Sequence, residues 1–335
     1  MQTNKEIHDI NTIELDKQEL HTLINLTKQL NISPSDNPEL FCKRAKELSE
    51  KIPERIKYIL NQFKEKGNKN GFLLVKNIIL PESELPLTPF GNNEMVGEKT
   101  TLARIQAILI NVIGEMVAYE AEGYGRLFQD VVPIKNMESV QTSLGSNTEL
   151  EIHTEQAFSK LRPDILGLAC LRGDENALTY ILPVSKIVDN CNSEEIKRLY
   201  EPLWKTGVDL SFKINGYEFI EGDIRGPLSI LNFSKTKDDP FLIFDEDLMT
   251  GLTEDSQQMV EKIVYIYYKH RIAHNLQPCE IIFIDNNRAV HGRSPFSPMY
   301  DGLDRFLVRC FATYDFEKSS YARPNGGRII SAIYS

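Results

Sequence analysis

Residues 281–291 read Ile281-Ile-Phe-Ile-Asp-Asn-Asn-Arg-Ala-Val-His291, and residues 305–311 read Arg305-Phe-Leu-Val-Arg-Cys-Phe311. The first segment starts with four apolar, mostly β-branched residues, which is typical of a buried strand, and then turns at its polar residues 285–288. The second segment is another apolar run, interrupted by two arginines. Both segments predict strands of a β-rich core in the C-terminal part of the chain.

Similar short runs recur upstream of this segment, and turn residues bound most of them. They predict strands at residues 127–132, 150–153, 165–171, 178–184, 209–214, 217–220 and 228–233. One long amphipathic stretch, residues 254–274, predicts a helix inserted among them. Strands this numerous without alternating helices favour an antiparallel jelly-roll barrel over a doubly wound sheet.

The first third of the chain has a helical pattern instead. Apolar residues recur at helical spacing over residues 15–30, Pro38 lies in the first turn of a second helix, and Pro53 begins a third. A short strand is expected at residues 72–75 and a long helix at 100–120. We therefore expect one catalytic domain of mixed α+β class over residues 1–335.

Within this domain, residues 1–120 are expected to form a mostly helical cover plus the first strand. Residues 121–335 are expected to form the jelly-roll core, with a lid near 215–227 and the inserted helix near 254–274.

The composition excludes several classes of protein. A net charge of −10 argues against nucleic-acid binding, which needs a basic surface. No apolar run is long enough to cross a bilayer, and the N-terminus lacks a signal-peptide pattern. The five cysteines are odd in number and never occur in CxxC spacing, which fits a reducing cytoplasm and argues against a thiolate zinc site.

The first chemical feature is His153-Thr-Glu155. Residues two apart on a strand point to the same face, so the imidazole and the carboxylate would converge as two ligands of an iron(II) facial triad. A distant histidine, His291, would be the third. With 6 His and 48 Asp and Glu residues, chance alone supplies about one such HxE/D motif. An exposed His and Glu on an edge strand is therefore the competing interpretation.

Arg305 and Arg309 make the iron interpretation more specific. Their spacing places both on one face of an apolar strand, where a buried guanidinium is costly unless it meets an anion. Arginine binds carboxylates through two parallel hydrogen bonds, so the strand predicts two carboxylates near the metal, one for each arginine. Internal salt bridges to Asp or Glu are the alternative.

His270 and His274 lie four residues apart in the expected helix at 254–274. This spacing can bind zinc, but the glutamate of an HExxH motif is absent, and a solvated helix end is the simpler interpretation.

Two motif blocks together resemble a known family. They comprise His153-Thr-Glu-Gln-Ala-Phe158, Leu161-Arg-Pro-Asp164, Leu168-Ala-Cys-Leu-Arg172 and residues 285–309. These blocks are similar to the clavaminate synthase-like 2-oxoglutarate oxygenases, over about residues 120–315. The helical N-terminus and the acidic segment at residues 244–249 are most similar to the free L-lysine hydroxylases of that family.

The resemblance implies a double-stranded β-helix, also called a jelly-roll or cupin-like core, with Fe(II) held by His153, Glu155 and His291. It implies that 2-oxoglutarate is bound by Arg305 with help from Thr179, and that O2 is the oxidant. The implied substrate-binding residues are Arg309, Gln129, Glu155, Asp245, Asp247 and Asp223. Arg309 would take the α-carboxylate, Glu155 and Gln129 the α-amino group, and the aspartates the ε-ammonium group.

The resulting hypothesis is a cytoplasmic hydroxylase of a free basic amino acid, most simply L-lysine at C4, with C3 next. Hydroxylation of arginine, ornithine or a carrier-tethered amino acid is a second hypothesis. A jelly-roll binding or sensor protein without catalysis is a third. Small molecules are the expected partners, and the sequence leaves a homo-oligomer open.

Overall fold

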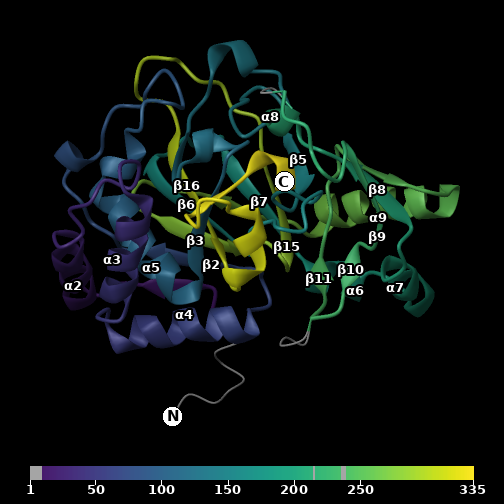
Figure 1. Ribbon diagram of the computed structural model, residues 1–335, viewed down its shortest axis with the longest axis horizontal. Helices are drawn as coiled ribbons and strands as arrows, with labels where there is room; N and C mark the ends of the chain where they lie inside the picture. The colour runs from purple at the N-terminus through teal and green to yellow at the C-terminus, as the bar shows by residue number, and fades with distance from the viewer. Residues whose placement is uncertain (1–9, 214–215, 235–238) are drawn as a thin grey trace.

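The central element of the computed structural model is a sheet of eight strands in the order β1-β2-β14-β6-β16-β3-β17, with β4 also paired to β16. The structure describes residues 10–213, 216–234 and 239–335 (Figure 1). The strands of this sheet are β1 (Thr12–Glu14), β2 (Phe72–Lys76), β3 (Glu115–Tyr119), β4 (Phe128–Val131), β6 (Ile165–Arg172), β14 (Ile281–Asp285), β16 (Phe306–Thr313) and β17 (Ile329–Ile330).

A second sheet of four antiparallel strands has the order β13-β7-β15-β5. Its strands are β5 (Leu150–His153), β7 (Leu178–Pro183), β13 (Ile272–Asn275) and β15 (Ala289–Arg293). The register of β15 against β5 places His291 directly opposite His153. Ile181 and Ala289 of this sheet share one buried cluster with Leu166, Ile282 and Leu307 of the large sheet, so the two sheets face each other.

Strand β14 illustrates why the large sheet is buried on both sides. Successive strand residues point to opposite faces. Ile282 and Ile284 belong to the cluster shared with the small sheet, whereas Ile281 and Phe283 belong to a cluster that includes the N-terminal helices. A strand buried on both faces needs a continuous apolar run, and Ile281-Ile-Phe-Ile284 supplies it.

Four helices pack on the outer face of the large sheet: α2 (Lys17–Thr27), α3 (Pro38–Ser49), α4 (Glu54–Lys66) and α5 (Thr101–Ile113). Asp16, Asn37 and Thr100 cap the first, second and fourth of these helices through side-chain oxygens. Helix α5 is almost entirely buried because it lies between the sheet and the other helices. These helices occupy the left side of Figure 1.

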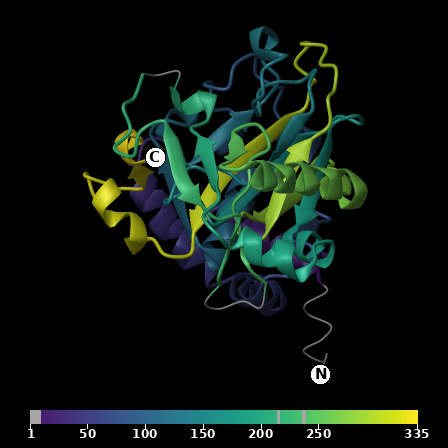
Figure 2. The ribbon, with the colours of Figure 1, turned by 90° about the vertical axis from the view of Figure 1, so that its right-hand side faces the viewer.

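The opposite side of the molecule is formed by α9 (Glu254–His270) and its neighbours. Met259, Ile263 and Tyr267 of α9 pack with Leu182 and Val290 of the small sheet. Figure 2 shows α9 in front of the strands. The remaining elements here are α6 (Val184–Asp189), α7 (Ser193–Leu199), α8 (Leu210–Lys213), β8 (Trp204–Gly207), β9 (Ile224–Leu228), β10 (Leu231–Asn232), β11 (Phe241–Leu242) and β12 (Met249–Gly251).

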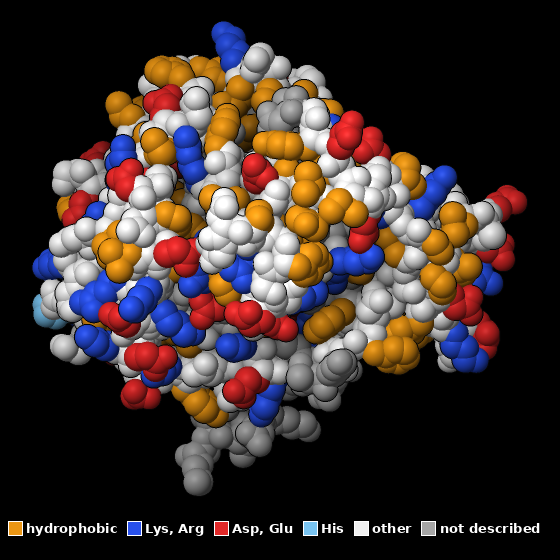
Figure 3. Space-filling model, viewed as in Figure 1, with side chains coloured by type: hydrophobic (Ala, Val, Ile, Leu, Met, Phe, Trp, Pro, Cys, Tyr) orange, Lys and Arg blue, Asp and Glu red, His pale blue; other side chains and the backbone are white. Residues whose placement is uncertain are grey.

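Six short 3-10 helices complete the described elements. They span Glu82–Glu84, Gly97–Lys99, Gly123–Gly125, Lys135–Met137, Glu317–Ala322 and Ala332–Tyr334. On the face seen in Figure 3, the described acidic and basic side chains are interspersed rather than gathered by sign. Among the described residues, no helix combines the length and apolarity needed to span a membrane.

The long helix expected at residues 100–120 is wrong in its last third. Helix α5 ends at Ile113, and Glu115–Tyr119 forms β3, which pairs with β16. The helix ends just before Gly114, where the chain passes close to β16. Only glycine fits there, because a Cβ would lie 2.7 Å from the Thr313 carbonyl oxygen. Residues 115–119 form a strand because their backbone pairs with β16. This pairing joins distant parts of the chain, so the local apolar pattern does not predict it.

The helix expected at residues 254–274 is also too long. Helix α9 ends at His270, and residues Ile272–Asn275 form β13 against β7. His270 and His274 are therefore not one helical turn apart, which removes the zinc interpretation. His274 Nε2 instead lies 2.8 Å from Glu280 Oε2.

Three expected strands near residues 209–233 need correction. Residues 210–213 form the short helix α8, residue 214 lies outside the described residues, and 217–220 form no strand. The strand expected at 228–233 divides into the end of β9 and the two-residue β10. Ile230 and Leu231 of the last segment pack in the cluster beneath α9, whereas Phe212 and Phe219 pack with Phe158 in a separate cluster. The apolar alternation of these segments therefore reflects local burial and not a continuous ladder.

Phe283 provides a test of the double-sided core. Replacing it with alanine removes a fully buried ring from the centre of the large sheet, and we expect the free energy of unfolding to fall by about 3–5 kcal/mol. Urea denaturation followed by circular dichroism measures this change. Phe90→Ala, at a residue that is 75% exposed, is the matched control and should change the stability by less than about 0.5 kcal/mol. Equal losses in both variants would contradict the described core.

Candidate metal centre

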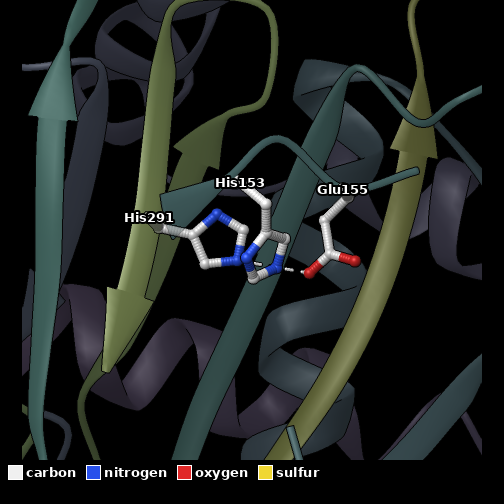
Figure 4. Close-up of side chains that lie close together, drawn as sticks. All are labelled: His153, Glu155 and His291. Carbon is white, nitrogen blue, oxygen red and sulfur yellow. Dashed lines mark ion pairs between the residues drawn. The ribbon is translucent and has the colours of Figure 1, made fainter. Parts of the chain in front are cut away.

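Three side chains converge where the two sheets meet: His153 from the end of β5, Glu155 two residues later, and His291 from β15 (Figure 4). One nitrogen or oxygen from each lies within 4.8 Å of the others. His291 Nε2 is 3.3 Å from Glu155 Oε1, and the two imidazole rings are 4.5 Å apart between centroids. Two imidazoles and one carboxylate form the ligand set of a non-haem iron(II) facial triad.

Glu155 reaches this position differently from the sequence expectation. Strand β5 ends at His153, so Glu155 lies in the following turn and not on the strand. Asn286, from the turn after β14, holds that turn in place. Its Oδ1 accepts a hydrogen bond from the Glu155 amide at 2.7 Å, and its Nδ2 donates to the Glu155 carbonyl at 3.1 Å.

The orientation of His153 suits metal binding. Its Nδ1 lies 2.8 Å from the Glu151 carbonyl oxygen. A protonated Nδ1 donates to this carbonyl, which leaves the lone pair of Nε2 free for a metal. His291 presents Nε2 to Glu155, while its buried Nδ1 has no hydrogen-bond partner in the described part of the chain.

The electrostatic surroundings favour the protonation states that a metal requires. Burial alone would raise the pKa of Glu155, but the Arg309 guanidinium and the two histidines lower it to about 2. Burial and the neighbouring His153 lower the pKa of His291. A carboxylate and a neutral imidazole are the forms that coordinate divalent cations.

The triad opens into a pocket that most of the sequence-predicted residues also line. Gln129, Thr179, Asp245, Asp247, Arg305 and Arg309 are all part of its wall. Asp223 is the exception, since it is exposed and does not line this pocket. Its main-chain carbonyl accepts the Val208 amide at 3.1 Å.

Arg305 directly precedes β16 and is buried. Within the described residues it forms no ion pair or hydrogen bond, and its nearest aromatic neighbour, Phe296, lies 5.9 Å away. Burial lowers its pKa. The Oγ1 atom of Thr179, which lines the same pocket, is also buried without a hydrogen-bond partner in the described part of the chain. The internal salt bridge that was the alternative for Arg305 is therefore not formed by any described residue.

Arg309 differs, because it is paired within the protein. Its Nη2 contacts Glu122, its Nη1 lies 3.6 Å from Glu155 Oε1, and its Nε donates to Gln129 Oε1 at 2.9 Å. Arg309 therefore has the internal ion pairs that the sequence left open as the alternative, and its contact with a substrate carboxylate stays a prediction. Arg309 has a protein partner that the sequence did not reveal.

That partner, Glu122, is buried at the start of a tight turn, and burial raises its pKa to about 7. Gln156 Nε2 donates to its second oxygen at 2.9 Å. The sequence feature that marks this turn is Gly123. Its φ of +59° favours glycine, and a Cβ there would lie 2.2 Å from the Gln129 side chain.

Several aspartates line the outer part of the pocket. Asp245 is buried beside His153, to which it is joined by an isolated β-bridge, and burial raises its pKa to about 6. Its Oδ1 accepts the Leu248 amide at 2.8 Å. Asp247 is exposed, and Asp209, which the sequence argument did not single out, is half-buried.

The lid expected near residues 215–227 includes residue 215, which lies outside the described residues. Its later part enters β9, which pairs with β8.

Comparison with known proteins agrees with this iron-site architecture. An L-lysine 3-hydroxylase of Catenulispora acidiphila is 46% identical over 295 residues, which span 88% of this chain and 82% of that protein. Clavaminate synthase 2 of Streptomyces clavuligerus is 29% identical over 88% of this chain and 89% of its own length. A solved structure of asparagine oxygenase with Fe(II), 2S,3S-3-hydroxyasparagine and succinate has a TM-score of 0.87 at 27% identity, covering 96% of this chain and 99% of that one. No family model matches the sequence.

The fold and the His-Glu-His triad define a non-haem iron oxygenase. Identity of 46% over most of both chains makes the assignment more specific: the chain belongs to the clavaminate synthase-like Fe(II)/2-oxoglutarate-dependent oxygenases. It is therefore an enzyme, and the predicted family resemblance is confirmed.

Removing one ligand tests the metal centre. We expect His291→Ala to weaken Fe(II) binding by at least about 100-fold, since it deletes a donor in a site where even an outer-shell change typically costs 10- to 100-fold. Anaerobic calorimetric titration with Fe(II) measures the affinity. His270→Ala, outside the triad, is the control and should bind Fe(II) like the unchanged protein. Unaltered binding by His291→Ala would contradict the assigned triad.

Proposed function

We propose that the enzyme hydroxylates free L-lysine, with Fe(II) held by His153, Glu155 and His291 and with 2-oxoglutarate and O2 as cosubstrates. The observation that carries this proposal is the buried guanidinium of Arg305, which shares the pocket of the triad and forms no ion pair or hydrogen bond with any described residue. A buried guanidinium without an ion pair is costly in free energy, and an anionic ligand would offset this cost.

The residues present fit both groups. The triad offers two imidazole nitrogens and one carboxylate oxygen to a metal (Figure 4). The remaining coordination positions of an iron ion held there would face the pocket and could be taken by ligands. When bound, Fe(II) and 2-oxoglutarate supply the oxidising chemistry, in which decarboxylation of 2-oxoglutarate to succinate accompanies hydroxylation of a C–H bond. The contribution of the protein is to bind and orient the substrates and to exclude water.

Arg305 and Thr179 would hold the distal carboxylate of 2-oxoglutarate. The Arg305 guanidinium can donate two parallel hydrogen bonds, and the Thr179 hydroxyl can donate a third. Both groups are buried in the pocket wall, and neither has a hydrogen-bond partner among the described residues. Together they form a binding site of the right charge for one carboxylate.

Arg309, Glu122, Gln129 and Glu155 would bind the backbone end of the amino acid. Arg309 carries the positive charge that an α-carboxylate needs, and Glu155 beside it carries the negative charge that an α-ammonium needs. A carrier-tethered amino acid has a thioester and no free carboxylate, so it would leave Arg309 without this contact. The free amino acid is therefore the favoured substrate form.

Asp209, Asp245 and Asp247 would bind the ε-ammonium group. All three line the pocket, and a cation removed from water needs negative charges around it. Asp223 lies outside the pocket and is left out of this proposal. Arginine and ornithine also carry terminal cations, and they differ from lysine in side-chain length and in the shape of the cationic group.

C3 is the carbon that we propose, in place of the C4 first expected from the sequence. The relative that is 46% identical is an L-lysine 3-hydroxylase, whereas L-lysine 4-hydroxylases match at 26% identity or less. The reacting carbon depends on the distance between the two ends that anchor the substrate, and 46% identity over most of both chains favours a similar distance.

We also infer that the two facing sheets are the halves of a double-stranded β-helix, with α2–α5 as its helical cover and α9 as an insertion within one domain. The shared cluster of Leu166, Ile181, Ile282 and Leu307 supports this inference, because the buried interior is continuous between the sheets. The third hypothesis from the sequence, a binding or sensor protein without catalysis, is set aside because the chain belongs to a family of oxygenases.

Substrate-dependent succinate formation tests the substrate class. We expect L-lysine to stimulate 2-oxoglutarate turnover with Fe(II), and L-norleucine, which lacks the ε-ammonium group, to be at least about 100-fold poorer in kcat/KM. The reason is that norleucine would leave the aspartates of the pocket without their cation. Arginine and ornithine are the comparison substrates. Absence of stimulation by all three basic amino acids would overturn the proposal.

The position of hydroxylation is tested separately on the product. Two-dimensional NMR of lysine after turnover should show the new hydroxyl-bearing carbon at C3, because the substrate is anchored at both ends and presents one carbon to the metal. Incubation of the enzyme with lysine and Fe(II) but without 2-oxoglutarate is the control and should leave lysine unchanged. A product hydroxylated only at C4 would reject the assigned carbon while leaving the substrate class intact.

A further inference from the structure

Arg293 is a second buried guanidinium in the pocket wall. It is the last residue of β15, is 4% exposed and lines the same pocket as Arg305. Its Nε donates to the Ser294 carbonyl at 3.0 Å, Nη1 to the Gly145 carbonyl at 2.7 Å, and Nη2 to the Thr148 carbonyl at 3.1 Å. All of these acceptors are neutral, and no carboxylate of the described chain pairs with Arg293.

Arg293 and Arg305 both lie close to the ring of Phe296. Their guanidinium carbons lie 5.0 Å and 5.9 Å from the centroid of Phe296. Two like charges in a buried wall repel each other, and neither has an acidic neighbour within ion-pair distance among the described residues. An anion bound beside Arg305 would relieve this repulsion. Arg293 also retains two of its five N–H donors beyond its three hydrogen bonds.

The acceptors of Arg293 belong to a loop that forms part of the pocket. Gly145 and Thr148 lie between β4 and β5, and residues 141–144 of this loop line the pocket. The loop folds back on itself, as the Ser146 amide donates to the Glu138 carbonyl at 3.0 Å. The Phe296 amide adds a second link, donating to the Ser146 carbonyl at 2.8 Å. Hydrogen bonds thus link the loop to Arg293 and to the main chain of Phe296.

We propose that Arg293 is a positioning residue that couples binding of 2-oxoglutarate to the order of loop 141–148, an inference that rests on the proposed function. The distal carboxylate of 2-oxoglutarate, placed beside Arg305, offsets the charge shared by the two arginines. Arg293 then holds the Gly145 and Thr148 carbonyls at lower electrostatic cost. The loop is thereby fixed as part of the pocket wall that the amino acid meets.

Two substitutions separate the charge of Arg293 from its hydrogen bonds. Arg293→Met removes both, whereas Arg293→Lys keeps the charge but cannot reach three carbonyls. Arg323→Met is the matched control. Arg323 is also buried and donates to two main-chain carbonyls, of Gly327 and Phe316, but it does not line the pocket.

The measurements are anaerobic titration of the Fe(II)-loaded enzyme with 2-oxoglutarate, followed by its visible charge-transfer absorption, and hydrogen–deuterium exchange of peptides covering 141–148. In the unchanged enzyme, 2-oxoglutarate should slow exchange in this loop. Arg293→Met should weaken 2-oxoglutarate binding by about tenfold or more, the order expected for loss of an outer-shell partner. Arg293→Lys should bind within about threefold of the unchanged enzyme, yet lose the ligand-induced protection of the loop.

Two results would overturn the inference. One is 2-oxoglutarate affinity and loop protection in Arg293→Met equal to those of the unchanged enzyme. The other is an equal loss of affinity in Arg293→Met and Arg323→Met, which would indicate general destabilisation. Failure of the unchanged enzyme to bind 2-oxoglutarate would instead refute the proposed function, and the inference with it, so the two failures are distinguishable.

Discussion

The antiparallel pairing of β5 with β15 is the constraint on which the rest of the site depends. It joins segments about 140 residues apart in the sequence and places His153 directly across from His291. Side chains opposite one another in such a pair lie about 5 Å apart, which is the separation that two ligands of one metal require. Asn286 then ties the turn of Glu155 to the turn between β14 and β15. One ladder and one asparagine thus assemble three ligands from two distant parts of the chain.

Buried positive charge is the second organising feature. Arg309 lies within ion-pair distance of Glu122 and Glu155, whereas Arg305 and Arg293 form no ion pair with any described residue. The difference divides the pocket into a region already balanced by the protein and a region that lacks an anion. An amino acid, which carries both charges at its backbone end, suits the first region. A dicarboxylate suits the second.

Local sequence predicted the site better than it predicted the connections around it. Motif spacing and family resemblance point directly to the triad, Arg305 and Thr179, and the structure brings them together in one pocket. The roles of Arg305 and Thr179 stay predictions. Glu122 was missed because its role arises only from the packing of its turn against β16. Strands β3 and β13 were read as the ends of helices, since the helical pattern is local and the competing ladders with β16 and β7 are not.

Crystallography with the bound ligands measures the central claim most directly. Crystals grown anaerobically with Fe(II), 2-oxoglutarate and L-lysine should give an anomalous peak at the iron edge between His153, Glu155 and His291. The distal carboxylate of 2-oxoglutarate should lie on the Arg305 guanidinium. An iron peak elsewhere, or a 2-oxoglutarate carboxylate with no contact to Arg305, would contradict the account.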